Sequence, residues 1–219
     1  IVKGASKGEG LGNQFLSHIR QVDAICHVVR CFDDDNITHV EGRVDPLEDI
    51  DTINLELVLA DLESINKRYT RVAKVAKTKD KDAVAELAVL DKIKPVLEEG
   101  KSARTIEFTE EEQKIVKSLF LLTTKPILYV ANVSEDDVAD ADANHYVQEV
   151  RNFAAEENAE VIVVSARAEE EIAELDEEDK AEFLEALGIE ESGLDQLIRA
   201  AYDLLGLATY FTAGEQEVR

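Results

Sequence analysis

Three short runs of β-branched and aromatic residues, at 23–32, 126–133 and 160–166, constrain the fold of this chain more than any other feature. Each run is continuous rather than alternating, which is typical of a strand buried on both faces of a sheet. Patterns of helical period lie between and after the runs, at 110–121, 141–157 and 193–205. Because strands that alternate with helices form parallel sheets through crossover connections, the outer parts of the chain predict one α/β domain.

The middle of the chain has no strand pattern and predicts a long helix instead. The helix should begin at Asp45-Pro46-Leu47-Glu48, where Asp45 can cap it and proline suits the first helical position. It should run to about residue 77, because apolar residues follow at the spacing of a heptad seam. These residues are Val58, Leu62, Ile65, Tyr69, Val72 and Ala76.

A heptad seam needs a partner, and a second helix that folds back can supply it. Its candidate contacts are Val84, Leu87, Leu90 and Leu97. Pro95 should kink or end this second helix, because proline lacks the N–H that an interior position needs. Thr109 with Glu112 forms a further capping box, which marks the return to the α/β body. We therefore expect a projecting arm of two antiparallel helices.

The composition excludes several classes of protein. Of 219 residues, 45% are apolar, so the chain can bury a core and is not a disordered tail. Two cysteines are too few for a disulfide scaffold, and no apolar run approaches the ~20 residues that span a bilayer. We expect a reducing, cytoplasmic location. The acidic stretch 169–191 should be mostly a solvated helix, and the absence of methionine leads us to expect a segment from inside a larger protein.

The histidines and cysteines do not have the spacing of a metal site, so we expect no metal ligand in this chain. His27 lies within a strand run and should be a packed core residue. Cys26 and Cys31 should point to opposite faces of one strand, so they cannot pair. The histidines are His18, His27, His39 and His145.

Residues 4–12, GASKGEGLG, have the composition of a loop. Their spacing fits neither phosphate-binding pattern: the P-loop would need glycine in place of Glu9, and the dinucleotide fingerprint would need it in place of Asn13. On spacing alone the segment predicts a mobile loop rather than a phosphate cradle. Its glycines are Gly4, Gly8, Gly10 and Gly12.

The charges are unevenly distributed. The chain has 48 acidic and 24 basic residues, yet residues 66–81 carry a net charge of +6, so the other 203 residues carry −30. A basic tip on a projecting arm is suited to contact a polyanion, although a solvated coiled-coil face with ordinary charges fits the pattern as well. The basic residues are Lys67, Arg68, Arg71, Lys74, Lys77, Lys79 and Lys81.

Longer segments carry a resemblance to a known family. GASKGEGLGNQFLSHIRQVDAICHVVRCF is similar to the segment that follows the phosphate-sensing aspartate motif in Obg-related P-loop nucleotide hydrolases. Its continuation, CFDDDNITHVEGRVDPLEDIDTINLELVLADLE, resembles the YchF or Obg-like ATPase family within that group. The likeness extends through KPILYVANVSED to the ending GLATYFTAGEQEVR and so covers essentially the whole chain.

The resemblance implies an α/β fold: a Ras-like P-loop NTPase domain, incomplete here, interrupted by a helical coiled-coil arm. The nucleotide-binding domain would comprise 1–40 and 119–205, the arm 41–118, and residues 206–219 would begin a TGS domain. The P-loop, switch I and the ligands of Mg²⁺ are expected upstream of residue 1.

The resemblance also places the base of a nucleotide. Relatives that bind GTP hold guanine with an N-K-x-D motif, where this chain has Asn132-Val133-Ser134-Glu135. In the YchF family this departure accompanies a preference for ATP. By resemblance Asn132, Val133 and Glu135 would bind adenine together with the second loop, Ser165-Ala166. The alternative is that residues 132–135 only turn a strand into a helix, with Ser134 as the cap.

Hydrolysis and partners follow from the same resemblance. Ile1 would occupy the position of the water-orienting glutamine of Ras-like enzymes, so intrinsic hydrolysis should be slow. The glycine-rich loop would act as the switch segment, and the basic tip would contact the ribosome or ribosomal RNA. We expect neither a membrane nor DNA as a partner.

Three functional hypotheses result. The first is a ribosome-associated ATPase, and the second is an Obg-type GTPase that keeps a guanine preference. The third is a non-enzymatic adaptor that binds through its coiled coil, which the isolated segment could be because it lacks a P-loop.

Overall fold

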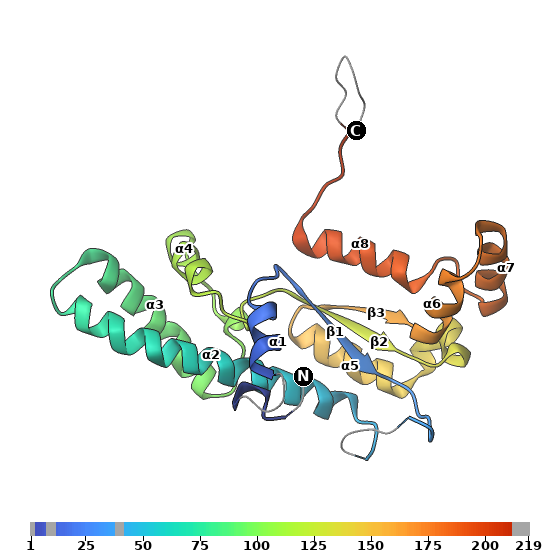
Figure 1. Ribbon diagram of the computed structural model, residues 1–219, viewed down its shortest axis with the longest axis horizontal. Helices are drawn as coiled ribbons and strands as arrows, with labels where there is room; N and C mark the ends of the chain where they lie inside the picture. The colour runs from blue at the N-terminus through green and yellow to red at the C-terminus, as the bar shows by residue number, and fades with distance from the viewer. Residues whose placement is uncertain (1–2, 8–11, 38–41, 212–219) are drawn as a thin grey trace.

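The computed structural model describes residues 3–7, 12–37 and 42–211. Three parallel strands form one sheet in the order β1 (Ile25–Arg30), β2 (Ile127–Asn132) and β3 (Glu160–Val164), as Figure 1 shows. Each strand lies within one of the three apolar runs, so the predicted parallel sheet is confirmed. β1 and β2 pair directly in the sheet, although about a hundred residues separate them in the sequence. The chain forms the arm between these two strands.

Helices cover the two faces of the sheet unequally. On one face, the start of α2 (Pro46–Ala76) and α5 (His145–Glu156) pack on all three strands around the buried ring of Tyr129. On the other face, α8 (Gly193–Leu205) packs on β2 and β3 through Leu197, Ala200 and Leu204. The second face of β1 therefore has no covering helix within the described residues.

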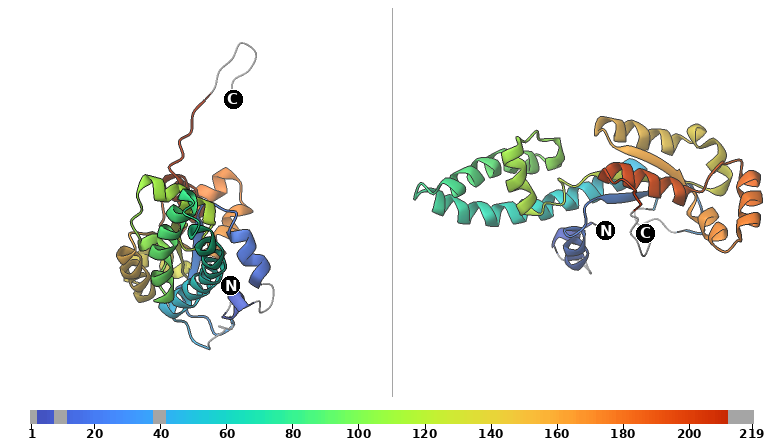
Figure 2. Two further views of the ribbon diagram at one scale, coloured as in Figure 1. Left: turned by 90° about the vertical axis from the view of Figure 1, so that its left-hand side faces the viewer. Right: turned by 90° about the horizontal axis from the view of Figure 1, so that it is seen from above.

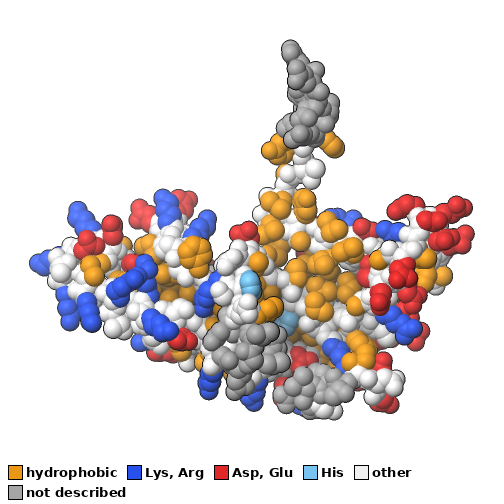
Figure 3. Space-filling model, viewed as in Figure 1, with side chains coloured by type: hydrophobic (Ala, Val, Ile, Leu, Met, Phe, Trp, Pro, Cys, Tyr) orange, Lys and Arg blue, Asp and Glu red, His pale blue; other side chains and the backbone are white. Residues whose placement is uncertain are grey.

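The prediction that β1 is buried on both faces is therefore wrong. Val29 is 2% exposed, whereas Val28 is 62% exposed and Cys26 is also exposed. Figure 3 shows hydrophobic side chains gathered over this part of the sheet and over the neighbouring α8. We call this surface the open face; its residues on β1 are Cys26 and Val28.

The arm is formed by α2 and α3 (Lys81–Glu98), which extend away from the sheet as an antiparallel pair (Figures 1 and 2). At 1.5 Å per residue, α2 is about 46 Å long. The predicted heptad seam is confirmed, because Val58, Ile65 and Val72 are buried against α3.

One predicted contact of the arm is wrong, and one of the two alternatives for Pro95 is excluded. Val84 is 49% exposed, and Ala83 fills the position against α2 in its place. Pro95 does not end the second helix but lies inside α3, which leaves the alternative of a kink untested. Ile93 and Leu97, on either side of Pro95, are fully buried against α2, and this packing outweighs the one helical hydrogen bond that proline cannot make.

The predicted helix starts are confirmed in the arm and at α8, which has the predicted bounds 193–205, whereas the acidic stretch differs. Asp45 accepts a hydrogen bond from the N–H of Glu48, and Thr109 and Glu112 form the reciprocal capping box of α4 (Glu110–Leu119). The acidic stretch is two helices rather than one, α6 (Ala166–Ala173) and α7 (Glu177–Leu187), because Asp176 caps a new helix. The remaining helical elements are η1 (Ala5–Lys7), α1 (Gly12–Ile19), η2 (Ala103–Thr105) and η3 (Glu135–Ala143).

Candidate functional site

The loops that follow β2 and β3 meet at the carboxyl edge of the sheet. Asn132 ends β2, and its Oδ1 accepts a hydrogen bond of 2.9 Å from the N–H of Ala166, which begins α6. The N–H of Val133 donates to the carbonyl of Val164 at 2.9 Å. In parallel α/β sheets ligands bind at this edge, so the two loops predicted to hold a base form one continuous surface where a ligand is expected.

The side chains of the two loops contribute unequally to that surface. Val133 is 2% exposed and Ser165 is 1% exposed, and the Ser165 hydroxyl accepts a hydrogen bond from the N–H of Ala168 as the cap of α6. These two residues therefore offer a ligand mainly their backbone. Asn132 differs, because its Nδ2 donates to no acceptor among the described residues. This amide is a donor that can face an acceptor nitrogen of a purine.

The carboxylate of Glu135 faces an arginine across the same surface. Glu135 begins η3, its side chain is 28% exposed, and its Oε1 lies 3.5 Å from the Nε of Arg167. Arg167 also lies 3.8 Å from Glu171 and is 77% exposed. Arg167 is not among the residues predicted from the sequence, although its position directly after Ser165-Ala166 is a usable signal. Ser134 is the N-cap residue of η3, as the alternative predicts, although its side chain makes no capping hydrogen bond.

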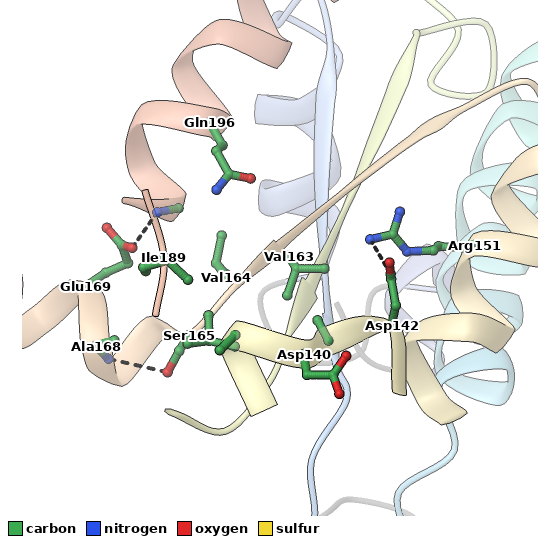
Figure 4. A pocket seen from close by; sticks show the side chains of 14 residues that line it. Asp140, Asp142, Arg151, Val163, Val164, Ser165, Ala168, Glu169, Ile189 and Gln196 are labelled. Atoms are coloured by element: carbon green, nitrogen blue, oxygen red, sulfur yellow. Dashed lines mark hydrogen bonds and ion pairs between the residues drawn. The ribbon is translucent and has the colours of Figure 1, made fainter. Parts of the chain in front are cut away.

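A cavity of about 240 Å³ opens beside the second loop, between η3, the end of β3 and α8 (Figure 4). Its polar groups are largely engaged within the protein. Glu169 accepts hydrogen bonds from the N–H groups of Gly193 and Leu194 at the start of α8, and Arg151 pairs with Asp142 at 3.1 Å. The cavity borders the base-loop surface through Ser165 and Ala168, whereas Asn132 and Glu135 do not line it.

The glycine-rich segment is described only in part. Ile1, Gly8 and Gly10 lie outside the described residues. Gly4 adopts φ +90°, a conformation that favours glycine, and a Cβ on Gly12 would lie 2.6 Å from the Ala5 backbone. These two glycines permit the tight turn and the close packing of η1 on α1.

The basic residues lie at the far end of the arm, where Figure 3 shows blue side chains on the left. Lys67 pairs with Glu63 at 2.5 Å, and Arg68 pairs with Glu86. The other members of the basic tip form no ion pair with any described residue and are exposed. They are Arg71, Lys74, Lys77, Lys79 and Lys81.

The whole chain is similar to curated proteins from several bacteria. It is 72% identical over 219 residues to the ribosome-binding ATPase YchF of Bacillus subtilis, and 56% identical to the protein of the same name from Haemophilus influenzae. A solved structure of the YchF GTPase of Schizosaccharomyces pombe matches 97% of this chain, with a TM-score of 0.84 and 38% identity. The chain belongs to the YchF family.

The chain spans about 60% of the length of these bacterial YchF relatives and 58% of the fungal YchF chain. No protein-family model matches it. The similarity to the solved YchF structure confirms the predicted fold, that of the P-loop nucleotide hydrolases with an inserted helical arm. The names of the relatives differ in one respect, since the bacterial YchF proteins are called ATPases and the fungal one a GTPase.

Two further properties bear on what this YchF-family chain can bind. Within residues 3–7, 12–37 and 42–211, no cluster of three or more His, Cys, Asp or Glu side chains has the arrangement of a metal site. None of the described helices combines the length and the apolar composition needed to cross a membrane.

Proposed function

We propose that this chain carries the base-recognition loops and the arm of a cytoplasmic, ribosome-associated ATPase. The observation that carries the proposal is the hydrogen bond from Ala166 N–H to Asn132 Oδ1, which joins the two predicted base loops into one surface. The name of the bacterial relatives, ribosome-binding ATPase, supports the same function. In this proposal the P-loop and the Mg²⁺ ligands come from outside the residues of this chain.

Adenine is the base that this surface fits better. In GTP-binding relatives an aspartate accepts hydrogen bonds from two donors of guanine, the ring N–H and the exocyclic amino group. Adenine presents an acceptor nitrogen at the position of that ring N–H. Here the carboxylate of Glu135 is turned to Arg167, and Asn132 Nδ2 offers a donor. Leaving a guanine donor unpaired costs about 1–3 kcal/mol, or roughly a 5- to 150-fold loss of affinity.

The double variant Val133→Lys with Glu135→Asp tests this proposal at the full length of the relatives. We expect the unchanged protein to bind ATP more tightly than GTP in a competition assay, because the carboxylate of Glu135 is turned toward Arg167 instead of standing where an aspartate accepts guanine's donors. The double variant should shift the ratio of affinities toward GTP by about tenfold or more. Asp136→Asn is the matched control, since it changes a neighbouring exposed charge on η3 and should leave the ratio unchanged.

The competition assay also decides the second candidate function. The name of the fungal relative, a GTPase, favours an enzyme that prefers GTP. A clear guanine preference of the unchanged protein would contradict the interpretation of Val133 and Glu135 and would support that candidate.

The open face and the free edge of β1 support a location for the phosphate-binding part. Parallel sheets are normally covered on both faces, and here Val28 is 62% exposed on a strand that has no neighbour on one side among the described residues. We place a P-loop strand along this edge, so the chain studied alone should bind nucleotide weakly and act at most as a coiled-coil adaptor. Strong Mg²⁺-dependent binding by this chain alone would show that the phosphate site lies elsewhere.

Ribosomal RNA is the partner proposed for the basic tip. Phosphate contacts release counterions, so the logarithm of the affinity should fall with the logarithm of salt concentration, by about 0.7–0.9 per contact. Neutralising four unpaired tip lysines should weaken ribosome binding and reduce that slope by about 3–4. The lysines are Lys74, Lys77, Lys79 and Lys81, each changed to glutamine.

Co-sedimentation with ribosomes across a salt series measures this effect. A matched comparison sets the two-lysine tip variant at Lys74 and Lys77 against a control pair at Lys114 and Lys117 on α4, which removes the same charge away from the tip. The control should bind like the unchanged protein. Equal binding and an equal salt slope for the tip variant would leave the basic tip as an ordinary solvated surface.

A further inference from the structure

A buried carboxylate of the arm helix holds the glycine-rich segment. Glu56 on α2 is 4% exposed, and its Oε1 accepts a hydrogen bond of 2.6 Å from the N–H of Gly4. Its Oε2 accepts a second bond of 2.8 Å from the N–H of Ser6. Burial by itself would raise the pKa of Glu56, but these bonds from Ser6 and Gly4 and the charge of Lys7 outweigh it and lower the pKa. The carboxylate is therefore ionised at neutral pH, and both bonds are of the stronger, charge-assisted kind.

A second contact joins the end of α1 to the same helix. Arg20 donates from Nη1 to Asp61 Oδ1 at 3.0 Å, and from Nη2 to the carbonyl of Ala60 and the hydroxyl of Ser64 at 3.2 Å each. Asp61 has no exposed surface. Residues 4 and 20 are thus both attached to α2 within the short span from Glu56 to Ser64.

The helix that makes these contacts is continuous with the basic tip. α2 runs without interruption to Ala76, about 30 Å beyond Glu56 at 1.5 Å per residue. The start of α2 packs against the sheet through Ile50, which has no exposed surface. A rearrangement of residues 4–6 must therefore either break the two bonds to Glu56 or move the helix that carries the tip.

We propose that Glu56 is a positioning residue that fixes the glycine-rich loop to the arm helix and couples the state of the loop to the position of the basic tip. This role rests on the two hydrogen bonds that Glu56 accepts from Gly4 and Ser6. The coupling to nucleotide rests on the function proposed above, whereas the attachment of the loop does not.

The attachment is tested in this chain by amide hydrogen exchange of Gly4 and Ser6. Glu56→Gln keeps the size of the side chain and removes the charge and one acceptor, so exchange at these amides should rise about tenfold or more. Asp51→Asn is the matched control, because it removes the same charge from an exposed position of α2 and should leave exchange unchanged. Unchanged exchange in Glu56→Gln overturns the proposal.

A general loss of structure would look different, because the amides of α2 would then exchange faster as well. If Glu56→Gln loses structure in this way, the same exchange measurement on Glu56→Asp tests the attachment. This variant retains the charge and shortens the side chain by one methylene. An intermediate increase confined to Gly4 and Ser6 supports the attachment, and exchange equal to that of the unchanged chain overturns it.

The coupling is tested at the full length of the relatives, by comparing ribosome affinity with ATP and with ADP bound. The ratio of the ribosome affinities with ATP and with ADP should be the same in the unchanged protein and in Asp51→Asn. In Glu56→Gln this ratio should move toward one by at least fivefold. A ratio that stays at its unchanged value in Glu56→Gln overturns the coupling. A protein that binds no ATP overturns the proposed function instead, and the exchange measurement still decides the role of Glu56.

Discussion

Asp61→Asn should be among the most damaging conservative changes in this chain. The carboxylate has no exposed surface and accepts four hydrogen bonds, from Arg20, from the N–H groups of Leu122 and Thr123, and from the Thr123 hydroxyl. Asparagine presents one oxygen and one NH₂ group in the same space, so a buried N–H then faces another donor. An unsatisfied buried N–H costs about 1–3 kcal/mol, and the loss of a charged hydrogen bond adds about 1.5–3 kcal/mol. We expect a total of about 3–5 kcal/mol, the range observed when a buried ion pair is broken.

Urea denaturation followed by circular dichroism measures this loss, and urea is preferred because it does not screen charges. Glu63→Gln is the matched control on the same helix. Its side chain is 58% exposed and, among the described residues, pairs only with Lys67, so the free energy of unfolding should change by less than about 0.5 kcal/mol. A loss below about 1 kcal/mol for Asp61→Asn would refute the reasoning that these buried bonds fasten α2 to the segment before β2.

Three further outcomes follow from the structure. Burial lowers the pKa of His27 to about 4 from 6.5, so only the unfolded chain gains this proton as the pH falls. The free energy of unfolding should therefore drop by about 2 kcal/mol between pH 7 and pH 5. The substitution His27→Gln should remove this part of the pH dependence. A pH profile of His27→Gln identical to that of the unchanged chain would contradict the assignment of this dependence to His27. Burial raises the pKa of the Cys31 thiol to about 12, whereas Cys26 is exposed. A thiol reagent should therefore modify Cys26 in the native chain and Cys31 only after unfolding. Equal rates of modification of the two cysteines in the native chain would contradict this. Gly12→Ala should destabilise the packing of α1 on η1 by about 1–3 kcal/mol in a thermal melt, because its Cβ would lie 2.6 Å from the Ala5 backbone, and an unchanged melting temperature would show that the segment shifts freely.

Features with a local period were predictable from the sequence. The heptad spacing of Ile65 and Val72 identified the arm, because a helix repeats its buried side every seven residues whatever lies opposite. The three runs of β-branched and aromatic residues identified the strands, because such a run favours a strand whatever lies opposite it. Pro95 was misjudged as a possible end of the helix because the cost of proline is local, whereas the burial of Ile93 and Leu97 that offsets it depends on the partner helix.

The buried charges could not be predicted. Glu56 and Asp61 lie in a helix whose other acidic residues are exposed or partly exposed, and nothing in their spacing distinguishes them. Their partners are 41 to 62 residues away in the sequence, so only the folded arrangement shows that each is enclosed. The base loops were accessible only through the resemblance, since Asn132 and Ala166 are 34 residues apart and meet through the pairing of β2 with β3.

The edge of β1 that pairs with no strand among the described residues gives this chain a means of associating with itself. A strand with unpaired N–H and C=O groups along one border is a template for a second copy, while the net charge of −24 keeps two copies apart at low ionic strength. Added salt weakens that repulsion without weakening the apolar attraction, so self-association should increase with salt while adhesion to polyanions decreases. In sedimentation experiments these opposite trends distinguish oligomers of the chain from its complexes.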